Sequence, residues 1–165
     1  STVPQPITLS TFGVPETLEP AGGTAFRVMR SYFTLEGNPV DLAQVAVGQR
    51  LVTVLNITPL GPVEARLMVD DPLPAGLEID NPNLIRSGDT EGLDWLQTPL
   101  TQMTQFRADR FLAAVDWRSD TPFDLAYIVR AISPGQFHHP AASVEDMYRP
   151  TDRGWGTTGV LNIQP

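Results

Sequence analysis

The sequence contains no cysteine, no lysine and no long apolar run. Without cysteine, the chain cannot form a disulfide, use a catalytic thiolate or bind a metal through cysteine sulfur. No stretch reaches the roughly 18 apolar residues that a membrane-spanning helix needs. The N-terminus lacks the basic region and apolar run of a signal peptide, and the chain begins at Ser1. If the protein is exported, we therefore expect a mature chain or an internal fragment.

The charge of the chain is acidic. All 11 basic residues are arginines, and together with 19 acidic residues they give a formal net charge of −8. Because an acidic chain is poorly suited to neutralise phosphate groups, this balance argues against nucleic acids or anionic membranes as partners. The absence of lysine fits a compositional bias.

Glycine and proline are frequent, at 13 and 16 of 165 residues, and they are spread along the chain. This distribution, with 41% hydrophobic residues, favours many short strands around one core over a bundle of helices. The helical spacing of Leu96, Leu100, Met103 and Phe106 predicts one short helix near residues 98–107. Apolar or alternating segments predict strands at 26–33, 45–57, 63–70, 111–117, 123–131 and 160–163.

These segments and their turns predict an all-β fold, an antiparallel β-sandwich of about seven to nine strands. We predict a single β-sandwich domain over residues 25–165, preceded by an N-terminal strand and loop at residues 1–24. The segment 45–57 is apolar on both faces, so we expect it at the centre of a sheet.

Two pairs of adjacent residues suggest chemistry at first sight. His138-His139 suggests a metal site, but neighbouring strand residues point apart and no cysteine or third histidine is available. We therefore favour a structural or surface role for both histidines. Asp70-Asp71 is a pair of acids, for which we favour a solvated or hydrogen-bonded role, because glycoside hydrolysis needs carboxyl groups facing one another across a cleft.

The remaining charged motifs also favour structural roles. Glu145-Asp146 is a second pair of acids, typical of solvated loops. Arg107, Asp109 and Arg110 suggest an ion pair, either solvent-exposed and weak or buried at the entry to the next strand. The sequence contains no Gly-rich phosphate loop, nucleophile elbow or HExxH motif. We expect no catalytic residues, no metal and no cofactor.

Six motifs in a fixed order give the chain a family resemblance. They are Arg30-x-Tyr32-Phe33, Leu73-Pro74-Ala75-Gly76-Leu77-Glu78, Arg107-x-Asp109-Arg110-Phe111, Tyr127-x-Val129-Arg130-Ala131, Pro134-Gly135-x-Phe137 and Val144-Glu145-Asp146-Met147-Tyr148-Arg149-Pro150. Over residues 12–150, this order resembles the C-terminal macroglobulin-like domain of bacterial alpha-2-macroglobulins. The last motif is the most specific of the six.

The resemblance implies a non-catalytic domain of a large periplasmic protease trap, whose parent chain is a lipoprotein anchored to the inner membrane. In that family, cleavage of a bait region triggers a conformational change, and a Cys–Gln thioester then acylates the attacking protease. Since this chain has no cysteine, the resemblance makes it the domain that packs on the thioester domain. Carried over to this sequence, the residues that shield the thioester are Met147 and Tyr148. The other implied partners are target proteases and a periplasmic cell-wall synthase.

The chemistry of a thioester agrees with this role. A thioester survives in water only where water and amines are excluded, and an aromatic ring beside a flexible thioether can close such a pocket. The absence of lysine gains a second interpretation here, because a lysine amine beside the thioester would acylate the inhibitor itself. Arginine keeps the positive charge but stays protonated, so it is a poor nucleophile.

Two other classes of function compete with this interpretation. A stand-alone extracellular adhesion or carbohydrate-binding sandwich would use exposed aromatic rings, with Trp95, Trp117 and Trp155 as candidates. Trp117 follows the alternation of an inward face, which weakens that alternative. A small hydrolase would use the paired acids or His138.

Overall fold

The computed structural model describes residues 8, 10, 20–80 and 103–165, which form β-strands joined by turns and loops. The strands are β1 (Gly22–Gly23), β2 (Phe26–Phe33), β3 (Val45–Ala46), β4 (Arg50–Pro59), β5 (Ala65–Pro72), β6 (Leu77–Ile79), β7 (Met103–Phe106), β8 (Arg110–Trp117), β9 (Phe123–Ala131), β10 (Gly135–His139), β11 (Ser143–Asp146), β12 (Arg153–Trp155) and β13 (Gly159–Gln164). Within the described ranges, no helix is long and apolar enough to cross a membrane. The predicted all-β class is confirmed.

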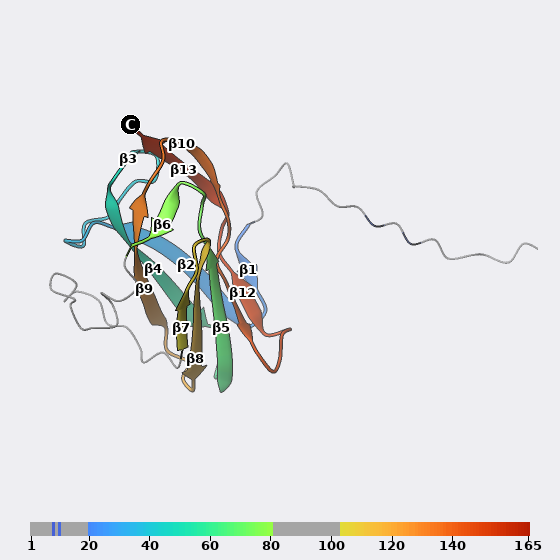
Figure 1. Ribbon diagram of the computed structural model, residues 1–165. Helices are drawn as coiled ribbons and strands as arrows, with labels where there is room; N and C mark the ends of the chain where they lie inside the picture. Colours follow the sequence, from blue (N-terminus) through green and yellow to red (C-terminus); the bar gives the residue numbers. More distant parts are fainter. Residues whose placement is uncertain (1–7, 9, 11–19, 81–102) are drawn as a thin grey trace, which may run out of the picture.

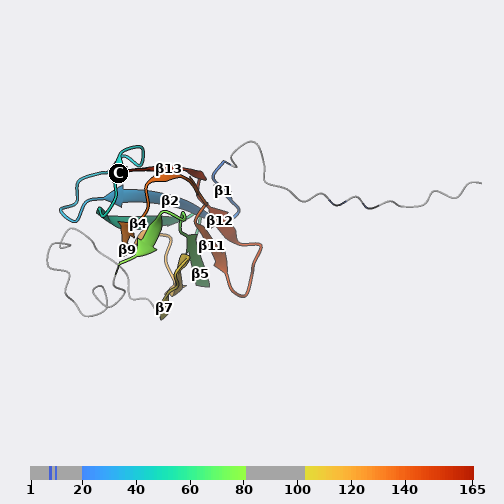
Figure 2. The same ribbon diagram turned by 45° about the horizontal axis from the view of Figure 1, so that its top comes forward.

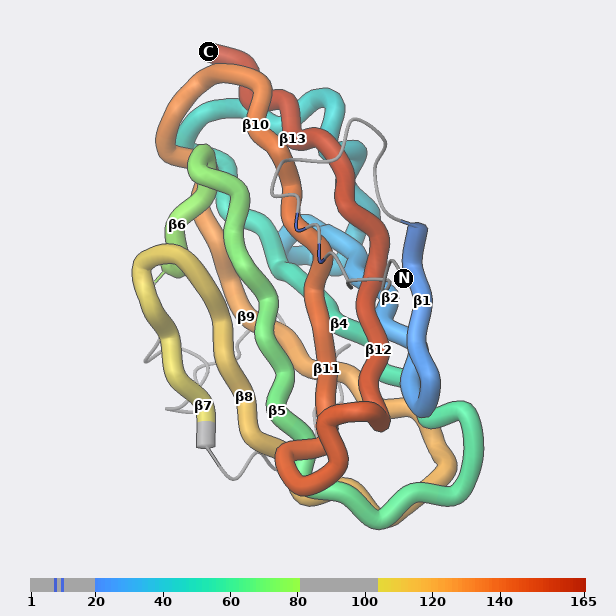
Figure 3. The backbone as a smooth tube through the Cα atoms, turned by 90° about the vertical axis from the view of Figure 1, so that its right-hand side faces the viewer, coloured from blue at the N-terminus to red at the C-terminus, as the bar shows by residue number. Residues whose placement is uncertain are grey.

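The strands pair into three sheets that form two layers (Figure 1). One layer contains the sheet β1-β12-β11-β5-β8-β7 and the smaller sheet β10-β13-β3. In Figure 3, β10 runs on into β11 and β12 runs on into β13, and a hydrogen bond from the Gly156 N–H to the Ala142 carbonyl (2.8 Å) joins the two paths. The other layer is the sheet β2-β4-β9-β6, whose strands β2, β4 and β9 follow one another in Figure 2.

Strand β4 is central because it is apolar on both faces. It pairs with β2 on one edge and with β9 on the other. Odd-numbered residues from Leu51 to Ile57 belong to the side of the main core, whereas Val52 and Val54 pack in a separate, smaller cluster. The central position predicted for segment 45–57 is therefore confirmed for β4.

The inward alternation of two strands carries charged residues into the core. On β5, Leu67 and Val69 are completely buried, and Asp71, which shares their side, is 0% exposed as well. On β2, Arg30 shares the inward side of Tyr32, and its side chain is only 9% exposed. Since an unpaired buried charge is costly, the two charged groups must satisfy one another or other polar groups.

The helix predicted near residues 98–107 is wrong over the part that the structure describes. Residues 103–106 form β7, which pairs antiparallel with β8 at the edge of the large sheet. The backbone groups of β8 gain a second partner strand, and the ring of Phe106 packs against that of Phe111 at 5.5 Å. The apolar segment with helical spacing is short, so pairing with a neighbouring strand outweighed its tendency to form a helix. Residues 98–102 of the predicted helix lie outside the described residues, as do most of residues 1–24, for which an N-terminal strand and loop were predicted.

Gly154 in β12 lies where strands from the two layers approach one another closely. A Cβ atom at this position would lie 2.3 Å from the carbonyl oxygen of Phe26, at the start of β2. The ring of Phe26 is completely buried, so its backbone has little room to shift. Glycine is therefore required for β12 to pass this close to β2.

Replacing Gly154 with alanine should lower the free energy of unfolding by about 2 kcal/mol, because the new methyl group overpacks against backbone. Gly159→Ala is the matched control, since a Cβ there meets nothing within 4 Å. That variant should stay within about 0.5 kcal/mol of the wild type. Urea unfolding followed by tryptophan fluorescence measures both, and equal stability of the two variants would contradict the close approach.

Candidate functional site

The loop between β11 and β12, residues 147–152, presents two large side chains to solvent. Tyr148 is 77% exposed and Met147 is 45% exposed. Among the residues that the structure describes, no other large apolar or aromatic side chain is as exposed as Tyr148. Isolated surface aromatics on loops are frequent anchors of recognition, so this loop is the candidate functional site.

Asp146, at the end of β11, organises the backbone of this loop. It follows the inward alternation of Val144 and is 1% exposed, so its carboxylate lies beneath the loop. The N–H of Tyr148 donates a hydrogen bond to Oδ1 of Asp146 at 2.9 Å, and the N–H of Arg149 donates to its backbone carbonyl at 3.1 Å. An aspartate that accepts from the backbone two residues on forms an Asx turn, which fixes the chain direction locally.

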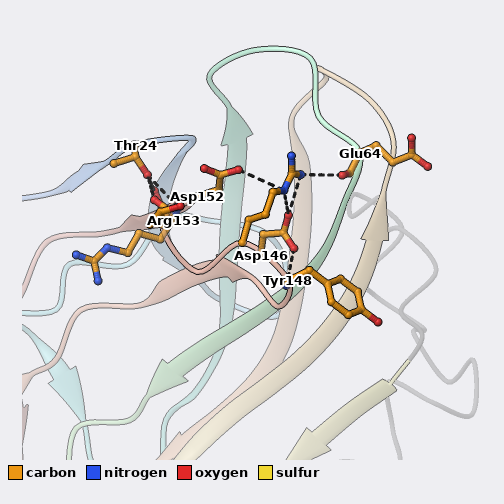
Figure 4. Close-up of polar contacts among 8 residues, drawn as sticks. Thr24, Glu64, Asp146, Tyr148, Asp152 and Arg153 are labelled. Atoms are coloured by element: carbon orange, nitrogen blue, oxygen red, sulfur yellow. Dashed lines mark hydrogen bonds and ion pairs between the residues drawn. The ribbon is translucent and has the colours of Figure 1, made fainter.

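Arg149 ties the same loop to a neighbouring segment. Its Nε donates to Oδ2 of Asp146 at 2.8 Å, and its Nη2 donates to the backbone carbonyl of Glu64 at 2.9 Å. The N–H of Met147 donates to the carbonyl of Arg66 at 2.8 Å, which provides a second link to the start of β5. Figure 4 shows the contacts of the Asp146 carboxylate on one side of the loop, while the ring of Tyr148 extends away from them.

The electrostatics of the loop hold Asp146 in its ionised form. Burial alone would raise the pKa of this carboxyl group, but the hydrogen bond from the Tyr148 N–H and the hydrogen bond and charge of Arg149 outweigh it. The pKa of Asp146 is therefore lower than usual. The Asp146–Arg149 contact is thus a charge-assisted bond at neutral pH, which is stronger than a neutral one.

A shallow depression of about 430 Å³ lies beside Tyr148. Arg66, Arg118 and Arg149 contribute to its lining, and Arg66 donates through Nε and Nη2 to Asp116 at 2.8 and 3.2 Å. The pKa of Arg66 is raised, mainly by the hydrogen bond and charge of Asp116 and then by the nearby Tyr148 hydroxyl. Among the residues lining this depression, none is a serine, cysteine or histidine nucleophile. The depression thus lies beside a ring that projects from a fixed turn.

A second polar cluster lies between the two layers and links Arg30 to Asp71. The Nη1 of Arg30 contacts Oδ1 of Asp71, and the hydroxyl of Tyr127 donates to Oδ2 of the same carboxylate at 2.7 Å. The ring of Tyr127 stacks on Phe111, with centroids 4.4 Å apart. Burial raises the pKa of Asp71, whereas the guanidinium of Arg30 and the Tyr127 hydroxyl favour its ionised form. This cluster joins β2, β5 and β9 across the core.

His139 completes the buried cluster and is neutral at physiological pH. Burial, and then the charge of Arg30, lower the pKa of His139 to about 4. Its Nδ1 lies against Nη2 of Arg30 and 3.2 Å from the carbonyl oxygen of Pro140, and its Nε2 lies 2.5 Å from the hydroxyl oxygen of Tyr32. Both ring nitrogens therefore have protein partners, while the adjacent His138 is exposed. Within the described part of the chain, no group of three or more potential metal ligands lies together.

Of the three residues of the predicted ion pair, Asp109 and Arg110 contact one another, whereas Arg107 has a different partner. Arg110 contacts Asp109 through Nε at 3.2 Å and Asp70 through Nη1 at 3.0 Å. Asp109 is 66% exposed and Arg110 is 36% exposed, at the turn between β7 and β8. Arg107 contacts the side chain of Gln105 at 3.5 Å instead of a carboxylate. These contacts lie at the surface, far along the chain from Met147.

The tryptophans that the structure describes are held by their own neighbourhood. Trp117 packs on Phe123 with centroids 4.4 Å apart, and its indole N–H donates to the Thr121 carbonyl at 3.2 Å. The indole N–H of Trp155 donates to the Pro20 carbonyl at 3.1 Å. Both side chains are half-buried rather than presented as a flat platform. The third candidate, Trp95, lies outside the described residues.

Sequence reasoning placed Met147 and Tyr148 together but missed the residues that hold them. The structure brings Asp146 and Arg149 beneath the loop, and Arg30, Asp71 and His139 into the core. The sequence did contain a signal for the burial of the two carboxylates. Alternate residues of a strand share a face, and each carboxylate continues a series of inward-facing apolar residues. The identity of its partner depends on the tertiary fold.

Comparison with known proteins gives consistent matches along most of the chain. Residues 26–151 match the family model of the bacterial alpha-2-macroglobulin MG10 domain. The alpha-2-macroglobulin of Xylella fastidiosa strain 9a5c is 31% identical over 169 residues, which covers 93% of this chain and 10% of that protein. The chain thus spans a small part of the length of the relatives it matches.

Solved structures agree with the sequence matches. The native conformation of Escherichia coli alpha-2-macroglobulin superposes with a TM-score of 0.81 at 27% identity, over 93% of this chain and 10% of that chain. Trypsin-activated alpha-2-macroglobulin from E. coli gives 0.78 at 29% identity, over 93% and 11%. Salmonella alpha-2-macroglobulin reacted with methylamine gives 0.77 at 28% identity, over 93% and 10%.

His139 should make the stability of this domain fall in mild acid. Its pKa is about 4 when folded, against an ordinary value of 6.5, so between these values only the unfolded chain binds the proton. The contribution is fully present above pH 6.5 and is lost as the pH falls toward 4, by up to about 3 kcal/mol. Urea unfolding between about pH 4.5 and pH 7 measures this dependence.

The matched pair of variants is His139→Gln and His138→Gln, two neighbouring histidines of which only the first is buried. His139→Gln should flatten the decline in mild acid, and His138→Gln should keep the wild-type decline. An unchanged decline in His139→Gln would show that another group causes it.

Proposed function

The chain belongs to the MG10 domain family of bacterial alpha-2-macroglobulins, and we propose that it is a non-catalytic domain that shields a thioester in its parent protein. The domain packs against the thioester domain of the same chain and keeps water and amines away from the bond. Cleavage of a bait region by a target protease separates the two domains, and the exposed thioester then acylates the protease. The observation that carries this proposal is the exposed ring of Tyr148 on its fixed turn.

The physical fit of Tyr148 to such a role is direct. A ring that is 77% exposed leaves most of its surface available for another domain, and burying an aromatic side chain at a domain contact is strongly favourable. Met147 beside it is flexible and polarizable, so it can fill the space around the ring. A folded domain can also move away from its partner as a rigid body together with this loop, which would expose the thioester without local unfolding.

The descriptions of related proteins support the wider proposal. One relative is described as activated by trypsin and another as reacted with methylamine. Activation by a protease fits a protein whose cleavage changes its state, and reaction with a small amine fits an electrophilic acyl group. For this parent we propose the same class of chemistry, with proteases as targets.

The compartment and further partners follow from the same proposal. The parent is a periplasmic lipoprotein anchored to the inner membrane, and a periplasmic cell-wall synthase is an additional partner. The lack of cysteine in this chain is compatible with this assignment, because the thioester cysteine belongs to another domain.

Replacing Tyr148 with glycine in the full-length parent should expose the resting thioester. We expect methylamine to release the thiol at least about tenfold faster than in the wild type, which corresponds to about 1.4 kcal/mol of lost protection. A thiol-reactive chromogenic reagent follows the release. Ile132→Gly is the matched control, because Ile132 is a 43%-exposed apolar residue in the loop before β10, away from Tyr148.

The control variant should release thiol at the wild-type rate. Equal rates for Tyr148→Gly and wild type would remove the shielding role and leave the domain as a packing scaffold. Absence of thiol release from every variant would mean that the parent carries no reactive thioester.

A further inference from the structure

A shielding side chain must be held where its target lies. Tyr148 stands on a loop, and a loop residue with a freely rotating backbone would sample many positions, so ordering it on docking would cost conformational entropy. In this chain the loop is closed at its neck, since the Asp146 N–H donates to the Asp152 carbonyl at 3.0 Å. The Asp152 N–H in turn donates to the Arg149 carbonyl at 2.8 Å. The backbone beneath Tyr148 is therefore hydrogen-bonded on both sides.

One side chain adds two further contacts to this loop. The carboxylate of Asp146 binds the backbone N–H of Tyr148 through one oxygen and the guanidinium of Arg149 through the other. Arg149 extends the connection to the Glu64 carbonyl, on the segment before β5. No other carboxylate drawn in Figure 4 contacts the Tyr148 backbone, and the carboxylate of Asp152 contacts Arg149, at 3.5 Å.

The burial of Asp146 argues for a dedicated role. A carboxylate next to a surface loop could reach water, as the neighbouring Glu145 does, yet Asp146 is 1% exposed. Burying a carboxylate is costly unless hydrogen bonds compensate. The compensation here comes from the two residues whose placement determines that of the tyrosine ring, so the buried charge fixes the loop as well as filling space.

We infer that Asp146 is the positioning residue for Tyr148: its carboxylate fixes the turn from which the ring projects, and Arg149 locks this turn onto the start of β5. The inference rests on the proposed shielding function of Tyr148. It adds that the shield is pre-organised before the domains meet, so that little entropy is lost when the thioester pocket closes.

The test uses the full-length parent with Asp146→Ala and Asp146→Asn. The alanine variant loses both contacts, and we expect methylamine-induced thiol release to accelerate about tenfold, close to the effect of Tyr148→Gly. Asparagine keeps an acceptor for the Tyr148 N–H but loses the charge that binds Arg149, so release should accelerate by only about threefold. Glu145→Gln is the matched control, because this neighbouring carboxylate is exposed, and it should stay at the wild-type rate.

The double variants separate positioning from a general loss of stability. If Asp146 acts through Tyr148, adding Asp146→Ala or Asp146→Asn to Tyr148→Gly should cause no further acceleration. Acceleration of the same size in both backgrounds would overturn the inference, because the substitution would then act on the whole domain. The isosteric asparagine variant keeps this comparison possible if the alanine variant does not fold.

The outcomes also separate this inference from the proposed function. Fast release in Tyr148→Gly with wild-type release in both Asp146 variants would overturn the positioning role and leave the shield intact. Wild-type release in all of these variants would overturn the shield and the positioning role together.

Discussion

Two buried carboxylates, Asp71 and Asp146, sit at inward positions of paired strands, β5 and β11. Each must have a cationic or hydrogen-bonding partner, because an unpaired buried charge would cost several kcal/mol, on the order of 3–5 kcal/mol when one partner is removed. Asp71 takes Arg30 from the opposite layer, so its pairing fastens the sandwich across the core. Asp146 takes Arg149 from its own loop, so its pairing shapes the surface. One electrostatic constraint therefore governs both the core and the candidate site.

The shape of the loop explains how a rigid domain can shield a reactive bond and later release it. Tyr148 projects from a hydrogen-bonded turn, and the contacts of the Asp146 carboxylate lie on the side away from its ring (Figure 4). The ring can thus be buried in a partner domain while the turn keeps its bonds. If the domain has the proposed shielding role, the turn would leave with its domain as one unit when the domains separate, without local refolding. This behaviour suits a protein that must be stable at rest and respond once.

The alternation of apolar and polar residues predicted much of the fold, because it indicates where strands lie and which of their faces is buried. The strands at 26–33 and 123–131 have the bounds that the alternation indicates. The helix near residues 98–107 was wrong over 103–106, because a short apolar run with helical spacing can equally pair as an edge strand. The alternation along β2 could have predicted that Arg30 is buried, but it could not have predicted which residues Arg30 contacts. Met147 and Tyr148 were predicted as site residues from a family motif. The turn beneath them depends on the geometry of the loop, which residue spacing does not predict.

The shielding role implies that Met147 and Tyr148 change their solvent exposure when the parent is cleaved. Hydroxyl-radical footprinting of the intact and the protease-cleaved full-length parent measures oxidation of these two side chains directly, without any substitution. The account predicts low oxidation of both in the intact protein and a clear rise after bait cleavage, toward the exposure of 45% and 77% seen in this domain. High oxidation of Tyr148 in the intact protein, unchanged by cleavage, would contradict it.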